Sequence, residues 1–277
     1  MPTPPRTQVV LITGASSGIG KATAERLLAD GHIVYVAARR VEKMQGLADQ
    51  GATALAMDVT KTEDAERVVA QIIAEQGRID ALFNNAGFGL YGAVEDTAID
   101  DARYQFEVNL FGLARLTQLV VPHMRAQGFG TILNTSSIGG KIYTPLGAWY
   151  HATKHALEGW SDSLRLELAP HGIRVVIVEP GIILTEFGDV MTKPMMERSG
   201  DGPYRDLAHG LAKAAEASYA KGEGSPPSVI ADVVAKAIGA ATPKTRYAAG
   251  HMAKPILALR RFLPDRWFDR LILSQST

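Results

Sequence analysis

The feature that most constrains the fold of this chain is a glycine-rich turn between a short apolar run and a helical pattern. The run Gln8–Thr13 has the length of a strand, and apolar residues after the turn recur at helical spacing until about Gly31. In such a unit, backbone N–H groups at the helix N-terminus point at an anion, and glycine lets the anion come close. The turn contains Gly14, Ser16, Ser17, Gly18, Ile19 and Gly20. We therefore expect a phosphate cradle, with a tight turn that binds nothing as the alternative.

Two known phosphate-binding patterns do not fit this turn. An ATP-type loop would need glycine at position 15 and Ser or Thr at position 22, and both positions hold alanine. The usual spacing of dinucleotide-binding glycines is not met either, because the glycines here fall at positions 14, 18 and 20. The ligand must therefore be inferred from the segments that follow.

Strand-like and helical patterns alternate along the rest of the chain. They predict one α/β domain over residues 1–277, a Rossmann-like doubly wound parallel sheet of about seven strands with helices on both faces. The further strands are expected at Ile33–Ala38, Thr53–Met57, Asp80–Phe83, Thr131–Thr135, Val175–Val178 and Arg246–Ala249. Ligands of such sheets lie at the carboxyl ends of the strands. Asp58, Asn85, Gly87, Ser136 and Ser137 fall at these ends, with Val59 and Ala86 next to them.

Two arginines, Arg39 and Arg40, follow the second expected strand. An acidic side chain at this point would bind the ribose 2′-hydroxyl of NAD(H), whereas arginine suits the 2′-phosphate of NADP(H). We therefore expect NADP(H) rather than NAD(H), with two solvated surface arginines as the alternative.

Tyr150 and Lys154 lie four residues apart in a helical pattern, so they share one helix face. The ordinary pKa of tyrosine is about 10, and a nearby ammonium favours the phenolate. We therefore expect a lowered Tyr150 pKa and a hydroxyl that acts as general acid or base, although such pairs also arise by chance on solvated helices. His151 and His155 do not share this face with Tyr150, so we expect no catalytic imidazole.

The composition excludes several kinds of site. The chain has no cysteine, which excludes disulfides, thiolate catalysis and Cys-ligated metal, and we expect no other metal site. Its 29 Lys and Arg residues balance 29 Asp and Glu residues, so nothing indicates a nucleic-acid partner. The first residues lack the charged and apolar regions of a signal peptide, and we expect a cytoplasmic location.

Three longer segments carry further expectations. A helix is expected over about Asp100–Arg125, with Asn109 beside its apolar face. Residues 186–227 mix Gly, Pro, Met and charge around one helical piece, Leu207–Ala220, and we expect this segment to close over the substrate as a lid. The tail, residues 250–277, is apolar and basic around Pro264. It suits packing on the lid or on a neighbouring subunit, or contact with a membrane surface.

Taken together, the motifs between Val9 and about Thr185 resemble those of the classical short-chain dehydrogenase/reductase family. They are Thr13-Gly-x3-Gly-x-Gly20, Asp58-Val59, Asn84-Asn-Ala-Gly87, Asn109, Ser137, Tyr150-x3-Lys154 and Pro180-Gly181 to Thr185. The 13 residues from Ser137 to Tyr150 match the family's spacing and favour Ser137 over Ser136.

The resemblance implies a role for each matched position. Ser137 would donate a hydrogen bond to the developing oxyanion, and Tyr150 would transfer the proton. Lys154 would hold the nicotinamide ribose and lower the Tyr150 pKa. Asn109 matches a fourth catalytic position, where the family's helix is locally distorted. The resemblance also adds Pro180, Gly181, Ile183 and Thr185 to the cofactor-binding residues.

The expected function is an NADP(H)-dependent oxidoreductase that interconverts an apolar ketone or aldehyde with its alcohol. The family usually pairs subunits through helices that here span about Asp100–Arg125 and Trp149–Pro170, so the resemblance implies a dimer or tetramer. Ser17 stands where some NADP-preferring members carry a basic residue, so the 2′-phosphate depends on Arg39, alone or with Arg40. The alternatives are a nucleotide-binding regulatory or scaffold protein with little turnover, and a peripheral membrane protein whose basic tail is its main function.

Overall fold

The computed structural model describes residues 7–274, except for the side chains of residues 189 and 218–220. Its centre is a sheet of seven parallel strands in the order β3-β2-β1-β4-β5-β6-β7, which confirms the predicted doubly wound sheet. The strands are β1 (Val9–Thr13), β2 (Ile33–Ala38), β3 (Thr53–Ala56), β4 (Ala81–Asn84), β5 (Gly130–Thr135), β6 (Ile173–Pro180) and β7 (Arg246–Ala249). The first and last thus lie close to the bounds expected from the sequence.

Strand β1 lies in the middle because it pairs on both sides. Its Val10 lies opposite Val34 of β2 and Ala81 of β4. All residues of β1 and β6 are buried, as expected for strands that are covered on both faces. The chain order reverses between β1 and β4, and such a switch point opens a crevice at the carboxyl ends of the strands.

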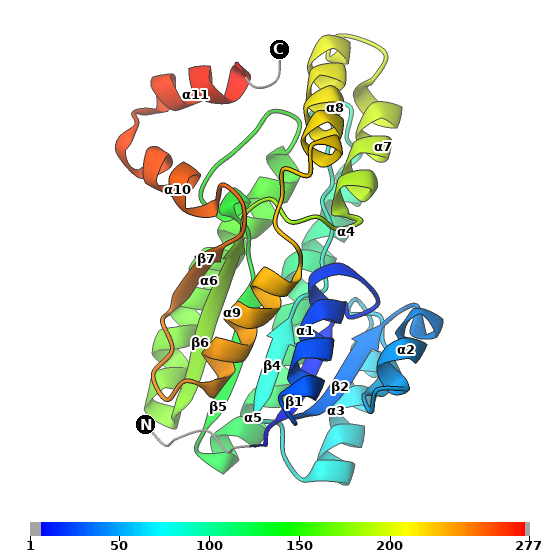
Figure 1. The fold of residues 1–277 in the computed structure, drawn as a ribbon, viewed down its shortest axis with the longest axis vertical. Helices are drawn as coiled ribbons and strands as arrows, with labels where there is room; N and C mark the ends of the chain where they lie inside the picture. Colours follow the sequence, from blue (N-terminus) through cyan, green and yellow to red (C-terminus); the bar gives the residue numbers. More distant parts are fainter. Residues whose placement is uncertain (1–6, 275–277) are drawn as a thin grey trace.

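Helices cover both faces of the sheet, and each face has its own apolar core (Figure 1). Successive residues of a strand point to opposite faces, so Ile12 packs with α1 (Gly18–Ala29) and α9 (Ser228–Gly239). Leu11 belongs to the other core, which holds residues of three helices. These are α3 (Thr62–Gln76), α5 (Leu113–Gln127) and α6 (Ala148–Leu168). Short elements complete this part: η1 (Val41–Met44), α2 (Gln45–Ala48), η3 (Ile138–Gly140) and η4 (Ala169–His171).

The helix expected over Asp100–Arg125 is interrupted. It consists of α4 (Ile99–Phe106), a π-helical turn η2 (Glu107–Gly112), and α5. The wider turn accommodates a close approach, because a Cβ on Gly112 would lie 2.6 Å from the carbonyl oxygen of Val59. Turns of this kind are frequent at functional sites, and this one carries Asn109.

The C-terminal third differs most from the sequence-based expectation. The segment 186–227 contains two helices, α7 (Phe187–Ser199) and α8 (Arg205–Ala220), of which only the second was expected. Pro194 and the mixed composition hid α7, because proline lowers the helical propensity of a stretch that tertiary packing still holds as a helix. The tail forms α10 (Ala253–Phe262) and α11 (Asp265–Leu273), which meet at Pro264.

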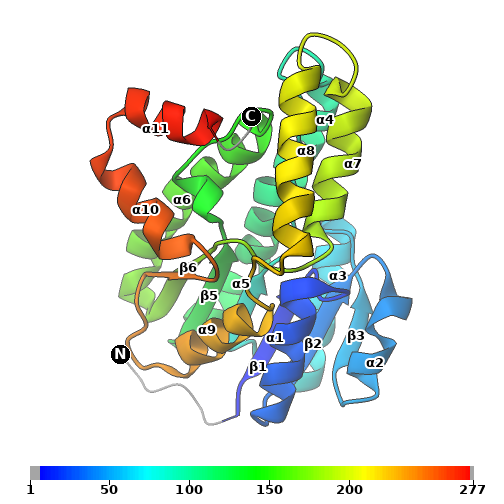
Figure 2. The same ribbon diagram turned by 45° about the horizontal axis from the view of Figure 1, so that its top comes forward.

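The two C-terminal helix pairs stand on opposite sides of the space above the sheet. Figures 1 and 2 both show α7 and α8 on one side and α10 and α11 on the other. The tail pair packs on the segment 138–143 of the same chain through Ile142 and Tyr143. Within residues 7–274, no helix has the length and apolar character needed to span a bilayer.

Candidate active site

A cavity of about 900 Å³ lies at the carboxyl ends of the strands, between the two C-terminal helix pairs. It is lined by the predicted cofactor-binding residues except Gly20, and by three of the four predicted catalytic residues. Gly20 lies under the turn, where a Cβ would come within 2.5 Å of the Gly14 carbonyl oxygen. Asn109 is fully buried behind the wall. The structure therefore brings the predicted residues together around one cavity.

The glycine-rich turn is held against the end of β4 by a close fit. Gly14 has φ +67°, and a Cβ there would lie 2.8 Å from the Cα of Ala86. The Thr13 hydroxyl accepts hydrogen bonds from the backbone N–H groups of Asn85 and Ala86, both at 3.0 Å. The Asn85 side chain in turn donates to the carbonyl oxygens of Thr13 and Gly14. Turn and strand end thus form one rigid floor.

The N-terminus of α1 is suited to an anion. Its first turn has no acidic residue, and Ser17 makes no capping bond within the described part of the chain. The first N–H groups of a helix have no partner inside the helix, so they can bind phosphate oxygens. Gly18, at φ +55°, keeps the approach open beside Thr185. These residues fit the pyrophosphate of a dinucleotide.

Arg39 and Arg40 directly follow β2, and both line the cavity. Arg39 Nη1 donates to the Tyr104 hydroxyl at 3.1 Å, and Arg40 Nη2 lies 3.9 Å from a carboxylate oxygen of Glu186. Both arginines are exposed, so neither is committed to a buried ion pair. The Asp58 carboxylate accepts from the backbone N–H and the hydroxyl of Thr60, which fixes the end of β3 beside them.

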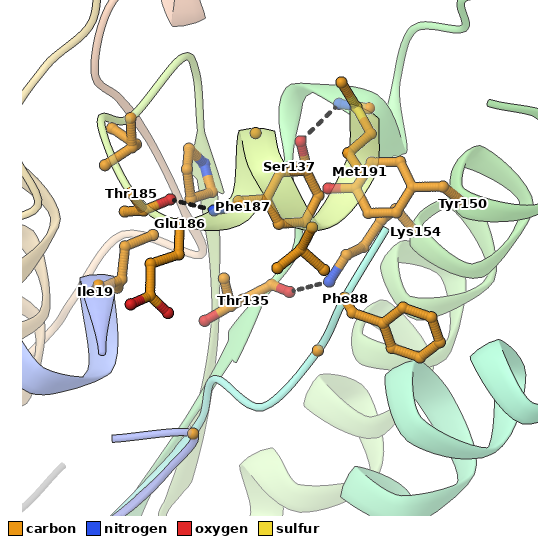
Figure 3. Close-up of a pocket in the computed structure, with 18 of the residues that line it drawn as sticks. Ile19, Phe88, Thr135, Ser137, Tyr150, Lys154, Thr185, Glu186, Phe187 and Met191 are labelled. Atoms are coloured by element: carbon orange, nitrogen blue, oxygen red, sulfur yellow. Dashed lines mark hydrogen bonds between the residues drawn. The ribbon is translucent and has the colours of Figure 1, made fainter. Parts of the chain in front are cut away.

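Ser137, Tyr150 and Lys154 converge at the other end of the floor (Figure 3). Ser137 follows β5, and its Oγ accepts from the Gly139 N–H at 3.0 Å. Tyr150 and Lys154 come from the first turns of α6 and are both nearly buried. Lys154 Nζ donates to the Thr135 carbonyl oxygen at 2.8 Å and lies 5.9 Å from the centre of the Tyr150 ring.

The pKa of Tyr150 differs from the expectation drawn from sequence. Burial raises this pKa above its ordinary value, and a hydrogen bond from Ser137 offsets part of the rise. The Lys154 ammonium does not lower it in this structure, because Nζ is turned to Thr135 rather than to the phenol oxygen. Burial also lowers the pKa of Lys154 to about 8, and the nearby Glu158 carboxylate opposes this change. At neutral pH Tyr150 is therefore a neutral hydroxyl and Lys154 is mostly an ammonium.

The π-helical turn presents Asn109 to the back of the site. Its Nδ2 donates to the Phe88 carbonyl oxygen at 2.9 Å and to the Thr153 hydroxyl at 3.1 Å. Its Oδ1 accepts from the Phe88 N–H at 3.1 Å. Asn109 thereby ties the loop after β4 to α6 one residue before Lys154, which is a positioning role.

His151 lines the cavity but is occupied by the chain itself. Its Nε2 accepts from the Thr144 N–H at 3.0 Å, which leaves the ring proton on Nδ1 to be donated to the Gly139 carbonyl oxygen at 2.9 Å. Burial lowers the pKa of His151 and favours this neutral form. The ring fixes the loop after Ser137.

A buried ion cluster lies behind Lys154 and joins α6 to β6 and β7. Glu158 pairs with Lys141 at 2.9 Å and with Arg246 at 3.1 Å, and Arg246 also lies 3.7 Å from Glu179. Burial raises the pKa of Glu179 to about 7, and the neighbouring Glu158 carboxylate adds to the rise. No local sequence pattern predicts this cluster, because its members are far apart in the chain.

The wall beyond Tyr150 is apolar and was not predicted residue by residue. The centre of the Tyr150 ring lies 5.7 Å from the centres of the Tyr91 and Phe187 rings. Figure 3 shows Phe187 and Met191 of α7 close to Ser137 and Tyr150. The other apolar lining residues include Phe88, Ile138, Ile142, Met195, Leu211, Met252, Ile256 and Ile272. Only their apolar character and helical spacing could have indicated this wall.

The chain is similar to proteins of one known family. A family model described as short chain dehydrogenase matches residues 8–195. The chain is 36% identical over 260 residues to a 3-ketodihydrosphingosine reductase of Bacteroides thetaiotaomicron, covering 93% of this chain and 94% of that protein. It is 32% identical over 275 residues to an NADPH-dependent 3-dehydrocapnine reductase of Ornithobacterium rhinotracheale, with 94% of each covered.

Solved structures agree with the fold. A short-chain dehydrogenase from Streptomyces avermitilis is 36% identical with a TM-score of 0.77, covering 91% of this chain and 92% of that one. A serine dehydrogenase complexed with NADP+ is 29% identical with a TM-score of 0.76, covering 87% and 94%. A 3-ketoacyl-(acyl-carrier-protein) reductase from Brucella melitensis complexed with NADH is 27% identical with a TM-score of 0.74, covering 86% and 94%.

Proposed function

The chain belongs to the short-chain dehydrogenase family, and from this premise we propose that it is an NADP(H)-dependent oxidoreductase that interconverts an apolar ketone or aldehyde with its alcohol. One observation carries the proposal. Ser137, Tyr150 and Lys154 meet in the same cavity as a phosphate cradle, at the carboxyl ends of the strands. A protein that only bound a nucleotide would need the cradle but not a Ser, Tyr and Lys set beside it.

The nicotinamide cofactor, when bound, supplies or accepts the hydride. In the reducing direction the Tyr150 hydroxyl gives its proton to the carbonyl oxygen, while Ser137 donates a hydrogen bond to that oxygen as negative charge develops. The raised pKa of Tyr150 keeps the hydroxyl protonated, which is the form that this step requires. Lys154 lines the same cavity, and its ammonium would hold the nicotinamide ribose.

Arg39 and Arg40 support a preference for NADP(H). They follow β2 and line the cavity, at the position that contacts the cofactor ribose in folds of this type, and guanidinium groups recognise phosphate well. The 3-dehydrocapnine reductase is NADPH-dependent by name, whereas the solved structures include complexes with NADP+ and with NADH. The preference proposed for this chain therefore depends on its own two arginines.

The apolar wall supports an apolar carbonyl substrate. Phe187, Met191 and Ile256 face the cavity beyond Tyr150 and offer contact with hydrocarbon rather than with charge. Two relatives are named as reductases, which supports the carbonyl-reducing direction. We infer that residues 186–227 act as a lid, because Phe187 at their start lies against the Tyr150 ring.

We also propose that the chain forms a dimer or tetramer. Phe111 of the π-helical turn and Leu166 of α6 are 52% and 68% exposed, on the elements through which the family usually pairs. Burial of these side chains in a subunit interface would remove apolar surface from water. Sedimentation at micromolar concentration is expected to show a dimer or tetramer, and a monomer alone would contradict this proposal.

The function is tested by measuring cofactor binding and turnover separately. Calorimetric titration is expected to show tighter binding of NADPH than of NADH. Incubation with NADPH and a panel of ketones and aldehydes is expected to yield alcohols, with apolar substrates preferred over small polar ones. Tight NADPH binding with no alcohol from any member of a broad panel would favour the regulatory alternative. Failure to bind either nucleotide would contradict the proposal as a whole.

A further inference from the structure

The tail helices α10 and α11 each have an inner face that packs against other residues of the same chain. Ile256, Phe268 and Ile272 are buried in a cluster with Ile142. Arg260 lies 5.2 Å from both the Tyr143 and Phe268 rings and pairs with Asp265 at 2.8 Å. The Tyr143 hydroxyl donates to Asp269 at 2.9 Å. Both acidic side chains of these helices are therefore engaged internally.

The outer face of the same helices is apolar and exposed. Pro255, Leu259 and Phe262 are spaced four and three residues apart, so they form one stripe along α10. Leu259 is 41% and Phe262 78% exposed, and Trp267 of α11 is 62% exposed. Large side chains at this exposure along two consecutive helices leave an apolar surface without a partner in the described chain.

This outer face is also basic. Between residues 253 and 273 the sequence has five Lys or Arg and two Asp, whereas the whole chain is neutral. Lys254, Arg261, Arg266 and Arg270 are exposed, and none forms an ion pair with a described residue. Arg261 lies 5.9 Å from the Phe262 ring and Arg270 lies 5.2 Å from the Trp267 ring, so charge and aromatic surface are adjacent.

We propose that the outer face of α10 and α11 docks on an anionic lipid surface. Basic side chains interleaved with Phe and Trp on an amphipathic helix match such a surface in both charge and polarity. A second copy of the chain is a poorer match. In a two-fold contact the same patch meets itself, which would bring the unpaired arginines of the two copies together.

The position of these helices means that docking would bring the catalytic cavity close to the lipid surface. This step depends on the proposed function. The inner side chains Ile256 and Ile272 line the catalytic cavity, while the outer side chains of the same helices face away from their core. Figures 1 and 2 show α10 and α11 on one side of the space above the sheet, opposite α7 and α8. An enzyme docked through the outer face of α10 and α11 has its cavity next to the lipid, from which an apolar substrate can enter.

The docking is tested by flotation of the full-length protein with vesicles, which needs no turnover. The probes are vesicles of phosphatidylcholine alone and of phosphatidylcholine with phosphatidylserine. Wild-type protein is expected to bind the phosphatidylserine vesicles, and salt is expected to weaken this binding. Quenching of Trp267 by lipids brominated in the acyl chain is expected, and Trp267→Phe is expected to remove that part of the quenching.

Two double variants separate the apolar and basic contributions. Phe262→Ser with Trp267→Ser, and Arg261→Gln with Arg270→Gln, are each expected to lower vesicle affinity by on the order of tenfold or more. The matched control, Val94→Ser with Lys236→Gln, changes one exposed apolar and one exposed basic residue elsewhere and is expected to bind as wild type does. Circular dichroism confirms that each variant is folded.

Several results would overturn the docking proposal. These are no binding to phosphatidylserine vesicles, equal binding to neutral vesicles, or equal binding by wild type and both double variants. Loss of a dimer in the Phe262→Ser, Trp267→Ser variant with no vesicle binding in wild type would show that a second copy covers the face. Tyr150→Phe is expected to bind vesicles normally, so a failure of the proposed function leaves the vesicle result unaffected.

Discussion

At one end of the cavity the walls are backbone, and at the other end they are apolar side chains. The cofactor end is built from glycines so close to their neighbours that a Cβ on Gly14 would lie 2.8 Å from Ala86. The substrate end is built from Phe187, Met191 and Ile256, which come from helices outside the sheet. Backbone contact permits few residue types at fixed positions, whereas an apolar wall can be made from many combinations.

The two ends also differ in how far the family match covers them. The matched family model ends at residue 195, before α8, α10 and α11 begin. The structure thus has a rigid end that we propose holds the cofactor and an adaptable end that we propose selects the substrate. Substitutions at the first end should affect folding and cofactor binding, and substitutions at the second should affect the substrate alone.

The largest expected effect comes from adding a methyl group at the rigid end. Gly14→Ala places a side chain at φ +67° against Ala86, so it combines backbone strain with overpacking. We expect a loss of about 3 kcal/mol of stability and a loss of NADPH binding. Urea unfolding and cofactor titration measure the two effects.

Gly31→Ala is the matched control for Gly14→Ala. Gly31 also has a positive φ, +83°, but no atom lies within 4 Å of an added Cβ. Strain alone should cost about 1 kcal/mol, with NADPH binding retained. Equal losses in the two variants would contradict the claim that close packing makes the floor of the cradle.

The next effect concerns the choice of cofactor. Arg39→Asp should weaken NADPH binding roughly 10- to 100-fold, because a charge-assisted phosphate contact is lost and a repulsive carboxylate is gained. NADH binding should stay the same or improve. Calorimetric titration of both cofactors measures this, with Arg40→Gln run alongside to separate the two arginines. Equal weakening of NADPH and NADH binding would show that Arg39 does not read the 2′-phosphate.

A smaller effect is expected at the adaptable end. Phe187→Ala removes the ring that packs on Tyr150 and should raise KM for an apolar ketone about tenfold, as expected for the loss of a buried aromatic contact. NADPH affinity should not change. Val190 lies on the same helix and is 46% exposed. Val190→Ala should therefore change KM less than Phe187→Ala does. A change in NADPH affinity with no change in KM would show that Phe187 belongs to the cofactor end of the cavity, against this prediction.

The smallest effect is a pH dependence of stability that originates behind the site. The Glu179 pKa is raised to about 7 in the folded protein from an ordinary value near 4.5, so its protonated form is favoured by folding. This contribution is complete below pH 4.5 and is lost as the pH rises to about 7. Glu179→Gln should therefore reduce the fall in stability between pH 5 and pH 7.5 by on the order of 1 kcal/mol. Parallel pH profiles of wild type and variant in urea unfolding would contradict this assignment.

The same contrast explains how much could be predicted from the sequence. The seven strands were placed within a few residues because buried parallel strands are continuous apolar runs, such as Val9–Thr13, that end in glycine or polar residues. The grouping of Ser137, Tyr150 and Lys154 followed from strand ends and helical spacing. Their chemistry remains a prediction, which the geometry supports.

Other features depend on contacts that no local pattern encodes. The helix α7 was missed because Pro194 lies inside it, and the Tyr150 pKa was expected to fall because spacing places Lys154 on its face but does not fix where Nζ points. The Glu158 and Glu179 cluster joins α6 to two strands that follow it much later in the sequence. The inner face of the tail packs on residues 138–143, a contact that no pattern in the tail indicated.

The most direct test of the central claim is NADPH oxidation with an apolar ketone by wild type and Tyr150→Phe, with NADPH binding measured on the same samples. The substitution removes one hydroxyl and keeps the ring contacts with Tyr91 and Phe187. We predict that kcat falls by roughly 10²- to 10⁴-fold, as expected for loss of a general acid, while NADPH binding is unchanged. Turnover by the variant at the wild-type rate would show that Tyr150 does not donate the proton and would contradict the account.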